Sequence, residues 1–258
     1  MNLAGKVVVL SGGASGLGRG TARYMVREKG ARVVVLDRNA AGGRELVDEL
    51  GDGSCRFHET DVTDEAAVAA AIDAGAAAFG AIHACLNFAG VVSPMRILDK
   101  EGRASNGARF RATVLVNLVG SFNVMAHCVE WMARNEPDAD NERGVVVNVA
   151  SGAAFDGQVG QSAYASSKAG VVGLALPAAR ELAELGIRVN TIAPGAFETP
   201  MIKSLPDSVL SRIASDFQFP KRFGTPDEIA GLCAFLCESG YMNGECVRLD
   251  GAFRLPPR

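Results

Sequence analysis

The sequence predicts an α/β fold: a single Rossmann-type, doubly wound parallel β-sheet with helices on both faces. Short apolar runs such as Arg32–Leu36 and Val145–Val149 alternate along the chain with segments of helical pattern. Strands that are apolar on both sides are typical of parallel sheets covered by helices on both faces. A glycine-rich segment between the first apolar run and the first helix also favours such a sheet. Right-handed crossovers then leave little choice of topology.

The elements of the first third can be assigned in order from these patterns. Strands are predicted at Lys6–Leu10, Arg32–Leu36, Ser54–Glu59 and Ile82–Leu86. Helices are predicted between them at Leu17–Lys29, Ala41–Leu50 and Asp64–Phe79, and Gly30 is a typical helix stop. In the helix after Gln161, Pro177 is expected to cause a kink or to open one hydrogen bond. Because no repeat or linker interrupts the chain, we expect one domain spanning residues 1–258.

Composition excludes several classes of protein. Of the 258 residues, 48% are hydrophobic and 21% are charged, which is enough apolar surface for a substantial core. The net charge of −3 argues against a general partner of nucleic acid or of anionic membranes. No apolar run approaches the ~20 residues that a membrane span requires.

The cysteines and the first residues indicate a reducing compartment. The six cysteines form no metal-like pairing, and Cys233 and Cys237, four residues apart on a predicted helix, are expected to be buried thiols. Met1–Lys6 leads directly into a strand and does not resemble a signal peptide. We therefore expect the cytoplasm, or the mitochondrial matrix in a eukaryote. The histidines are dispersed and are interpreted as structural, without a metal site: His58, His83 and His127.

Glycines between the first strand and the first helix suit a pyrophosphate. Gly12, Gly16 and Gly18 let the backbone turn sharply and approach a ligand, while the following helix offers free amides and its positive end. The spacing is Gly-x-x-x-Gly-x-Gly, which differs from the commonest dinucleotide pattern. Asp37 closes the second strand, where a ribose 2′-hydroxyl would need an acceptor; its alternative role is a solvated strand end.

Three later residues can act together on an alcohol oxygen. Tyr164 and Lys168 are four residues apart, so on a helix they share one face, and Ser151 follows the apolar strand Val145–Val149. An ammonium beside a phenol lowers the phenol pKa from its ordinary value near ~10. Such a pair and a serine hydroxyl can move a proton on or off an alcohol oxygen. Taken singly, Tyr-x-x-x-Lys is a common surface pair and the serine a common turn residue.

The order and spacing of these motifs resemble the short-chain dehydrogenase/reductase family over essentially the whole chain. The matching segments are Gly12–Gly18, Asn87-Phe88-Ala89-Gly90, Ser151, Tyr164-Ala165-Ser166-Ser167-Lys168 and Pro194-Gly195. The resemblance implies an NAD-dependent oxidoreductase that interconverts a secondary alcohol and a ketone. It implies that Tyr164 is the acid/base and that Lys168 binds the nicotinamide ribose and lowers the Tyr164 pKa. It also implies that Ser151 holds the substrate oxygen and that Asn117 anchors a water in a proton relay.

The resemblance further implies which residues contact NAD. They lie in the glycine turn, at strand ends and on the catalytic helix: Gly12, Ser15, Gly16, Leu17, Gly18, Asp37, Asp61, Val62, Asn87, Ala89, Gly90, Tyr164, Lys168, Pro194, Phe197 and Thr199. Phe88 departs from the family pattern, because that position usually holds a small or polar residue.

Within the family, the chain resembles the 3-hydroxyacyl-CoA dehydrogenase type-2 branch, whose members also oxidise some hydroxysteroids. The similar stretches are 135–138, 155–161, 176–180 and 243–252. This implies conversion of 3-hydroxyacyl-CoA to 3-oxoacyl-CoA. The alternatives are a hydroxysteroid dehydrogenase, a 3-oxoacyl thioester reductase and a non-catalytic NAD-binding scaffold. The resemblance also implies a homotetramer or a homodimer, and small residues on the helix after Gln161 fit either a subunit contact or packing on the chain's own sheet.

Two loop regions are expected on the substrate side. Residues 197–223 combine three prolines with large apolar side chains, which is typical of a mobile lid. Basic residues occur there and after the fourth strand: Arg96, Lys100, Arg103, Lys203, Lys221 and Arg222. Because both segments leave the carboxyl ends of strands, these charges suit the phosphates of coenzyme A. The alternative is that they are ordinary solvated loop charges.

Overall fold

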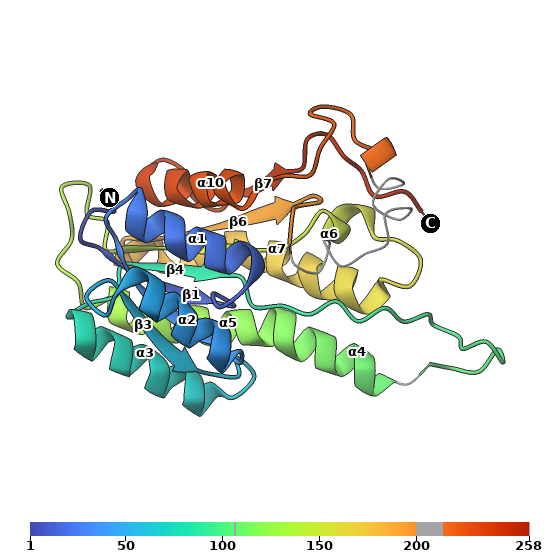
Figure 1. Cartoon of the computed structure of the whole chain (residues 1–258), viewed down its shortest axis with the longest axis horizontal. Coiled ribbons are helices and arrows are strands. Elements are labelled where there is room, and N and C mark those ends of the chain that lie inside the picture. The colour runs from blue at the N-terminus through green and yellow to red at the C-terminus, as the bar shows by residue number, and fades with distance from the viewer. Residues whose placement is uncertain (106, 200–213, 258) are drawn as a thin grey trace.

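Over the described residues, 1–105, 107–199 and 214–257, the computed structural model contains a seven-stranded sheet in which every pair is parallel (Figure 1). The strands are β1 (Val7–Ser11), β2 (Arg32–Asp37), β3 (Cys55–Glu59), β4 (Ala84–Asn87), β5 (Gly144–Val149), β6 (Ile187–Pro194) and β7 (Cys246–Leu249). Their order is β3-β2-β1-β4-β5-β6-β7, so successive strands are added in opposite directions on either side of the β1–β4 pair. The predicted fold is confirmed, and ligands of such sheets bind at that reversal point.

Helices cover both faces of the sheet (Figure 1). They are α1 (Gly16–Arg27), α2 (Ala40–Leu50), α3 (Glu65–Phe79), α4 (Gly107–Val114), η1 (Leu115–Val119), α5 (Gly120–Met132), α6 (Ala153–Asp156), α7 (Ser162–Leu182), η2 (Ala183–Leu185) and α10 (Pro226–Glu238). Alternate strand residues point to opposite faces. Val8 and Leu10 therefore join one core with α1, α2 and α10, while Val7 and Val9 join a second core with α3, α5 and α7.

Some element boundaries differ from those predicted, each for a local reason. β4 begins at Ala84, because the carbonyl of the buried Ile82 accepts a hydrogen bond from the Asn135 side chain instead of from a strand. α1 ends two residues early, and Gly30 then takes a left-handed φ of 63°. α7 continues through Pro177 as one helix. Because proline has no backbone N–H, one hydrogen bond of the helix is missing at this turn.

The helical stretch Gly107–Met132 corrects one expectation from the sequence. It is 26 residues long and, by length and composition alone, apolar enough to cross a membrane. In the fold, α4 packs against α7 and α5 packs against α3, and 44% of the most apolar window is buried. The π-helical turn η1 divides it and carries the buried Asn117.

Cysteines and histidines are used for packing and local hydrogen bonds. All six cysteines are free, and Cys233 and Cys237 are fully buried, as predicted. Burial raises the pKa of the Cys237 thiol to about 12. His83 accepts a hydrogen bond from the Val7 amide at its Nδ1, and burial lowers the pKa of His83 to about 4, so the ring is neutral. Within the described residues, no three His, Cys, Asp or Glu side chains gather closely enough to hold a metal ion.

The segment predicted as a lid, 197–223, is described only at its two ends, because 200–213 lie outside the described residues. At these ends Phe197 and Phe217 are only 6% and 5% exposed. Phe217 packs edge-on against Phe223 and Phe253, with ring centroids 5.0 and 5.2 Å apart. These two side chains are therefore packed at the described ends of the segment, and the lid itself stays a prediction.

Candidate active site

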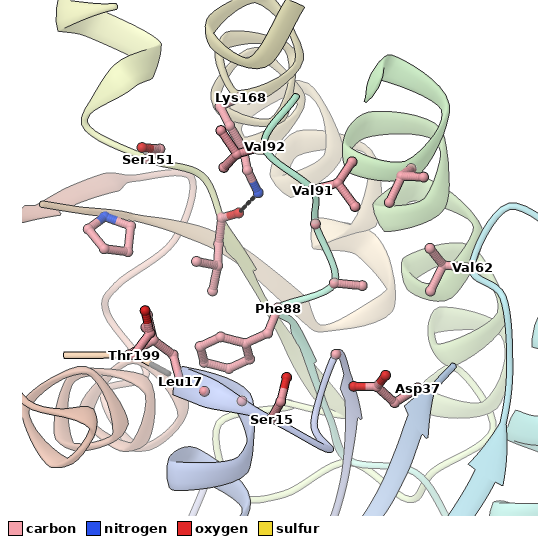
Figure 2. A pocket seen from close by; sticks show the side chains of 18 of the residues that line it. Ser15, Leu17, Asp37, Val62, Phe88, Val91, Val92, Ser151, Lys168 and Thr199 are labelled. Carbon is pink, nitrogen blue, oxygen red and sulfur yellow. Dashed lines mark hydrogen bonds between the residues drawn. The ribbon is translucent and has the colours of Figure 1, made fainter. Parts of the chain in front are cut away.

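A cavity of about 540 Å³ opens at the carboxyl ends of the central strands, where the strand order reverses (Figure 2). Sixteen of the residues proposed from the sequence line it: Gly12, Ser15, Gly16, Leu17, Gly18, Asp37, Asp61, Val62, Ala89, Gly90, Ser151, Tyr164, Lys168, Pro194, Phe197 and Thr199. They follow different strands, so the fold brings them together. Asn87 and Asn117 are not among the lining residues.

The glycine turn lets the ends of β1 and β4 touch. Gly12 has a left-handed φ of 69°, and a Cβ there would lie 2.6 Å from the amide nitrogen of Ala89. A Cβ on Gly18 would collide with the carbonyl oxygen of Gly12. The N-cap of α1, Ser15, makes no capping hydrogen bond with its side chain, so the first amides of the helix are not capped by it. The turn and these amides fit the pyrophosphate of a dinucleotide.

Asp37 ends β2 at the cavity and is oriented by the same turn. Its Oδ2 accepts a hydrogen bond from the Ala14 amide at 3.0 Å. Its neighbour Arg38 is directed to Asp61, with Nη1 3.5 Å from Oδ2. The pKa of Asp61 lies below its ordinary value, first because the Thr63 amide donates to it and then because of the Thr63 hydroxyl and Arg38. Asp37 is therefore available to ribose hydroxyls, while Arg38 already has a carboxylate partner.

Asn87, predicted to contact the dinucleotide, instead has its side chain inside the protein. It is 1% exposed, and its Oδ1 accepts a hydrogen bond from the Ser11 hydroxyl at 2.9 Å. Its Nδ2 donates to Oδ1 of Asn148 at 2.9 Å and to the Ser121 carbonyl at 3.1 Å. These contacts tie β1, β4, β5 and α5 together below the cavity. The side chain therefore supports the cavity without lining it.

Asn117 also lies behind the cavity wall. Its Oδ1 accepts from the Val91 amide at 2.7 Å, and its Nδ2 donates to the Val91 carbonyl at 3.0 Å and to the Ser167 hydroxyl at 2.9 Å. A Cβ on Gly90 would lie 3.3 Å from both Asn117 Oδ1 and Lys168 Nζ. The side chain thus holds the segment after β4 against α7, and Asn117 Oδ1 and Lys168 Nζ both flank Gly90.

Ser151 and Tyr164 lie together at the cavity. They come from the end of β5 and the first turn of α7, and both line the cavity. Burial raises the pKa of Tyr164, and the nearby Ser151 side chain offsets only part of this effect. Burial therefore keeps the phenol protonated, and the expectation that Lys168 lowers this pKa is not met in the protein alone.

Lys168 is buried one helical turn after Tyr164. Its Nζ donates to the Val149 carbonyl at 2.7 Å (Figure 2). Because burial disfavours the ammonium, the pKa of Lys168 falls to about 8. Its charge therefore persists at neutral pH, but only narrowly. An ammonium has three donors, so two remain for other partners.

The sequence analysis missed the apolar part of the lining. Phe88, Val91, Val92 and Val149 line the cavity. Figure 2 shows Phe88 near Leu17, and Val91 and Val92 on the segment that leads away from it. The signal was present in the sequence, since Phe88 to Val92 form an apolar run around Gly90. This side of the cavity suits a hydrocarbon portion of a substrate.

The basic residues predicted to bind phosphates have other arrangements. Arg103 lies 3.3 Å from Asp99 and 3.4 Å from Glu101, and Arg222 makes two hydrogen bonds to Glu228, at 2.9 and 2.8 Å. None of the five described members of the set lines the cavity, and Lys203 lies outside the described residues. These charges do not support a coenzyme A site.

Comparison with known proteins identifies the class. A family model described as enoyl-(acyl carrier protein) reductase matches residues 12–253. The match covers nearly the whole chain, so the protein belongs to this family of short-chain dehydrogenases/reductases and is an oxidoreductase.

Its relatives narrow the class further. The chain is 44% identical to the 3-hydroxyacyl-CoA dehydrogenase type-2 of Bos taurus and to that of Homo sapiens, each over 257 residues, 99% of this chain and 98% of the relative. A crystal structure of 3-hydroxyacyl-CoA dehydrogenase type-2 from Mycobacterium avium matches with a TM-score of 0.94 and 43% identity over 98% of both chains. A 3-oxoacyl-[acyl-carrier-protein] reductase of Thermotoga maritima is 34% identical over 97% of this chain and 98% of its own. The predicted resemblance is confirmed.

Lys168→Met should change how stability depends on pH. The pKa of Lys168 is about 8 in the folded protein, against an ordinary value of 10.5, so the unfolded chain binds more protons between these values. The wild type therefore gains stability as pH rises through this window, by about 3 kcal/mol, and the variant lacks this gain. The free energy of unfolding of both proteins can be measured with urea at about pH 7 and about pH 10. Between these two values, the wild type should gain stability relative to the variant.

The exposed Lys100→Met is the control for loss of a lysine. If the Lys168 variant shows the same pH response as this control, the buried ammonium is not responsible.

Proposed function

We propose that this protein oxidises the 3-hydroxyl group of short 3-hydroxyacyl-CoA thioesters with NAD. The observation that carries the proposal is that Ser151, Tyr164 and Lys168 line one cavity, with Tyr164 one helical turn before Lys168 on α7. The 44% identity to 3-hydroxyacyl-CoA dehydrogenases supports the choice of substrate. Two hydroxyls that face one cavity can hold an alcohol oxygen between them.

In this mechanism Tyr164 removes the proton of the substrate hydroxyl, and the Ser151 hydroxyl donates to the same oxygen as it becomes a carbonyl. Burial keeps the phenol protonated in the protein alone, so a neighbouring positive charge is needed for it to act as a base. When bound, an oxidised nicotinamide supplies the hydride acceptor and a positive charge. Lys168 contributes the second positive charge from one turn along α7.

Lys168 and Asn117 would act together behind Tyr164. The Lys168 ammonium uses one donor on the Val149 carbonyl and has two left for a ribose hydroxyl and a water. Asn117 Oδ1 and Lys168 Nζ lie against the same residue, Gly90, which supports the proposed role of Asn117 in a proton relay. The Asn117 side chain would also keep Gly90 and Val91 in place beside the nicotinamide.

NAD is the proposed cofactor because of the residues around the first strand ends. The glycine turn and the first amides of α1 would hold the pyrophosphate. Asp37 would accept hydrogen bonds from the adenine ribose, and Asp61 and Val62 would lie beside the adenine. Pro194, Phe197 and Thr199 would flank the nicotinamide end; all line the same cavity.

A hydroxysteroid is the second candidate substrate. The lining by Phe88, Val91 and Val92 is apolar, and none of Arg96, Lys100, Arg103, Lys221 and Arg222 lines the cavity, which favours a ligand without phosphates. A 3-oxoacyl thioester reductase, running the reaction in the opposite direction, is supported only by the 34% identical relative. A non-catalytic scaffold is disfavoured because Ser151, Tyr164 and Lys168 are all present at the cavity.

Three further expectations stay as proposals. Residues 1–258 would act as a single catalytic domain, with a substrate lid within 197–223. The protein would assemble as a homotetramer or homodimer, without nucleic acid or membrane partners. It would work in the cytoplasm, or in the mitochondrial matrix in a eukaryote.

The substrate proposal predicts NAD reduction by 3-hydroxybutyryl-CoA with a higher kcat/KM than by hydroxysteroids. Absorbance of NADH is the measurement, with both substrate classes offered to the same preparation. If a steroid alcohol is oxidised with the higher kcat/KM, the acyl-CoA proposal is wrong and a hydroxysteroid becomes the proposed substrate.

Tyr164→Phe should retain the fold and the binding of NADH, because only one hydroxyl is lost from the ring. It should lower kcat by about 10²–10⁴, the usual contribution of general acid–base catalysis. NADH fluorescence titration is the control for binding. A variant that keeps more than about a tenth of the wild-type rate would show that Tyr164 is not the base.

Asp37 should make the protein prefer NAD to NADP. A second negative charge at ~4 Å costs about 4 kcal/mol at an effective dielectric of ~20, whereas the exposed Arg38–Asp61 pair contributes ~0–1 kcal/mol. Asp37→Asn keeps an acceptor but removes the charge, so the ratio of kcat/KM for the two cofactors should fall at least about tenfold. Asp61→Asn, which frees Arg38, should change the ratio less. Comparable constants for NAD and NADP in the wild type would show that Arg38 dominates.

A further inference from the structure

The segment after β5 carries Ser151, and short-range hydrogen bonds connect Ser151 to the helical turn α6. Ser151 Oγ accepts a hydrogen bond from the Ala153 amide at 3.1 Å, and its carbonyl accepts from the Ala154 amide at 3.0 Å. The Asp156 amide donates to the Gly152 carbonyl at 3.0 Å, which closes the single turn of α6. A displacement of Asp156 is therefore transmitted to the Ser151 hydroxyl through one helical turn.

Arg248 of β7 holds the far end of this turn. Its Nη2 donates to Oδ2 of Asp156 at 2.5 Å, and its guanidinium lies 5.1 Å above the centre of the Phe155 ring. Its Nε donates to Oδ2 of Asp250 at 2.7 Å, and the same oxygen accepts from Arg254 at 2.7 Å. The Asp250 side chain is 7% exposed and those of Arg248 and Asp156 are 23% and 24% exposed, so these three are largely shielded from water, while Arg254 is 53% exposed.

Backbone contacts fix the rest of the segment from two sides. The C-terminal residues run beside it (Figure 1): the Gln158 side chain donates to the Pro256 carbonyl at 3.0 Å, and the Val159 amide donates to the Pro257 carbonyl at 3.1 Å. On the other side, the Met95 amide donates to the Gly160 carbonyl at 2.8 Å. The Arg248–Asp156 ion pair joins α6 to β7, and Asp156 Oδ2 also lies 3.8 Å from Arg254 Nε.

We propose that Arg248 and Asp156 are positioning residues that hold Ser151 and Phe155 in place for the alcohol substrate. The inference rests on the proposed function only in requiring that Ser151 binds the substrate oxygen. The Arg248 side chain contacts Asp156, Asp250 and Phe155, so we expect its loss to affect the alcohol half of the site more than the glycine turn and Asp37.

The experiment compares Arg248→Met, Asp156→Asn and the double variant. Each single change should lower kcat/KM for the alcohol at least about tenfold, and the double variant should be little worse than Arg248→Met, since both single changes remove the Arg248–Asp156 pair. Arg248→Met also removes the pair with Asp250, so Asp156→Asn is the more selective of the two changes. The dissociation constant of NADH, from fluorescence titration, should stay within about twofold of the wild type. Arg248→Lys keeps the charge and should recover part of the activity.

Arg134→Met is the matched control. Arg134 pairs with Glu130 at 2.5 Å and lies 4.7 Å above the Trp131 ring, so it makes the same two kinds of contact on α5, away from the cavity. Its loss should leave kcat/KM within about twofold of the wild type. Equal losses in Arg134→Met and Arg248→Met, or an NADH affinity that weakens as much as kcat/KM falls, would overturn the proposal.

Hydrogen exchange provides a measurement that needs no turnover. In Arg248→Met, the amides of residues 152–159 should exchange faster, while those of 12–18 should not. The kinetic comparison uses whichever secondary alcohol the wild type oxidises fastest. The test of Arg248 and Asp156 therefore remains valid even if the proposed substrate class is wrong. Unchanged exchange at 152–159 would refute the positioning role even if the protein oxidised none of the alcohols offered.

Discussion

The geometry of the site depends on one buried amide, the side chain of Asn87. Strand register places Ser11, Asn87 and Asn148 side by side on β1, β4 and β5, and the Asn87 amide bonds to both neighbours. Leaving such a group without partners in the interior costs about 1–3 kcal/mol, so the three strand ends are held at fixed spacing. The glycine turn, the segment at Gly90 and the loop with Ser151 all start from these strand ends.

A second set of hydrogen bonds connects these strand ends to α5 and α7. Asn87 donates to the Ser121 carbonyl, and the Ser121 hydroxyl donates to the Asn117 carbonyl at 2.8 Å. Asn117 lies in the π-helical turn η1 and binds both Val91 and Ser167, the residue before Lys168. The wide turn at η1 is thus part of the support for the site, which is a common use of π-helical turns. Sheet, α5 and α7 form one connected polar framework.

The sequence was sufficient for the fold and for most of the cavity, because apolar runs specify buried strands and the motif residues follow strand ends. It was insufficient where a side chain's direction depends on a distant partner. Asn87 points to Ser11 and Asn117 to Val91, so neither lines the cavity. Phe217 is interior because Phe253 covers it. Arg248 and Asp156 are separated by 92 residues, and no local pattern relates them.

Burial shifts the pKa values of Tyr164 and Lys168 in opposite directions. The same loss of water raises the pKa of Tyr164 and lowers that of Lys168, so it favours the neutral form of both. Lys168 still carries its charge at neutral pH, but burial keeps the phenol protonated until a further positive group lies beside it. A site built in this way would remove a proton from an alcohol only when a hydride acceptor of positive charge is also in place. The apolar lining by Phe88 and Val149 strengthens this dependence, because it keeps the local dielectric low.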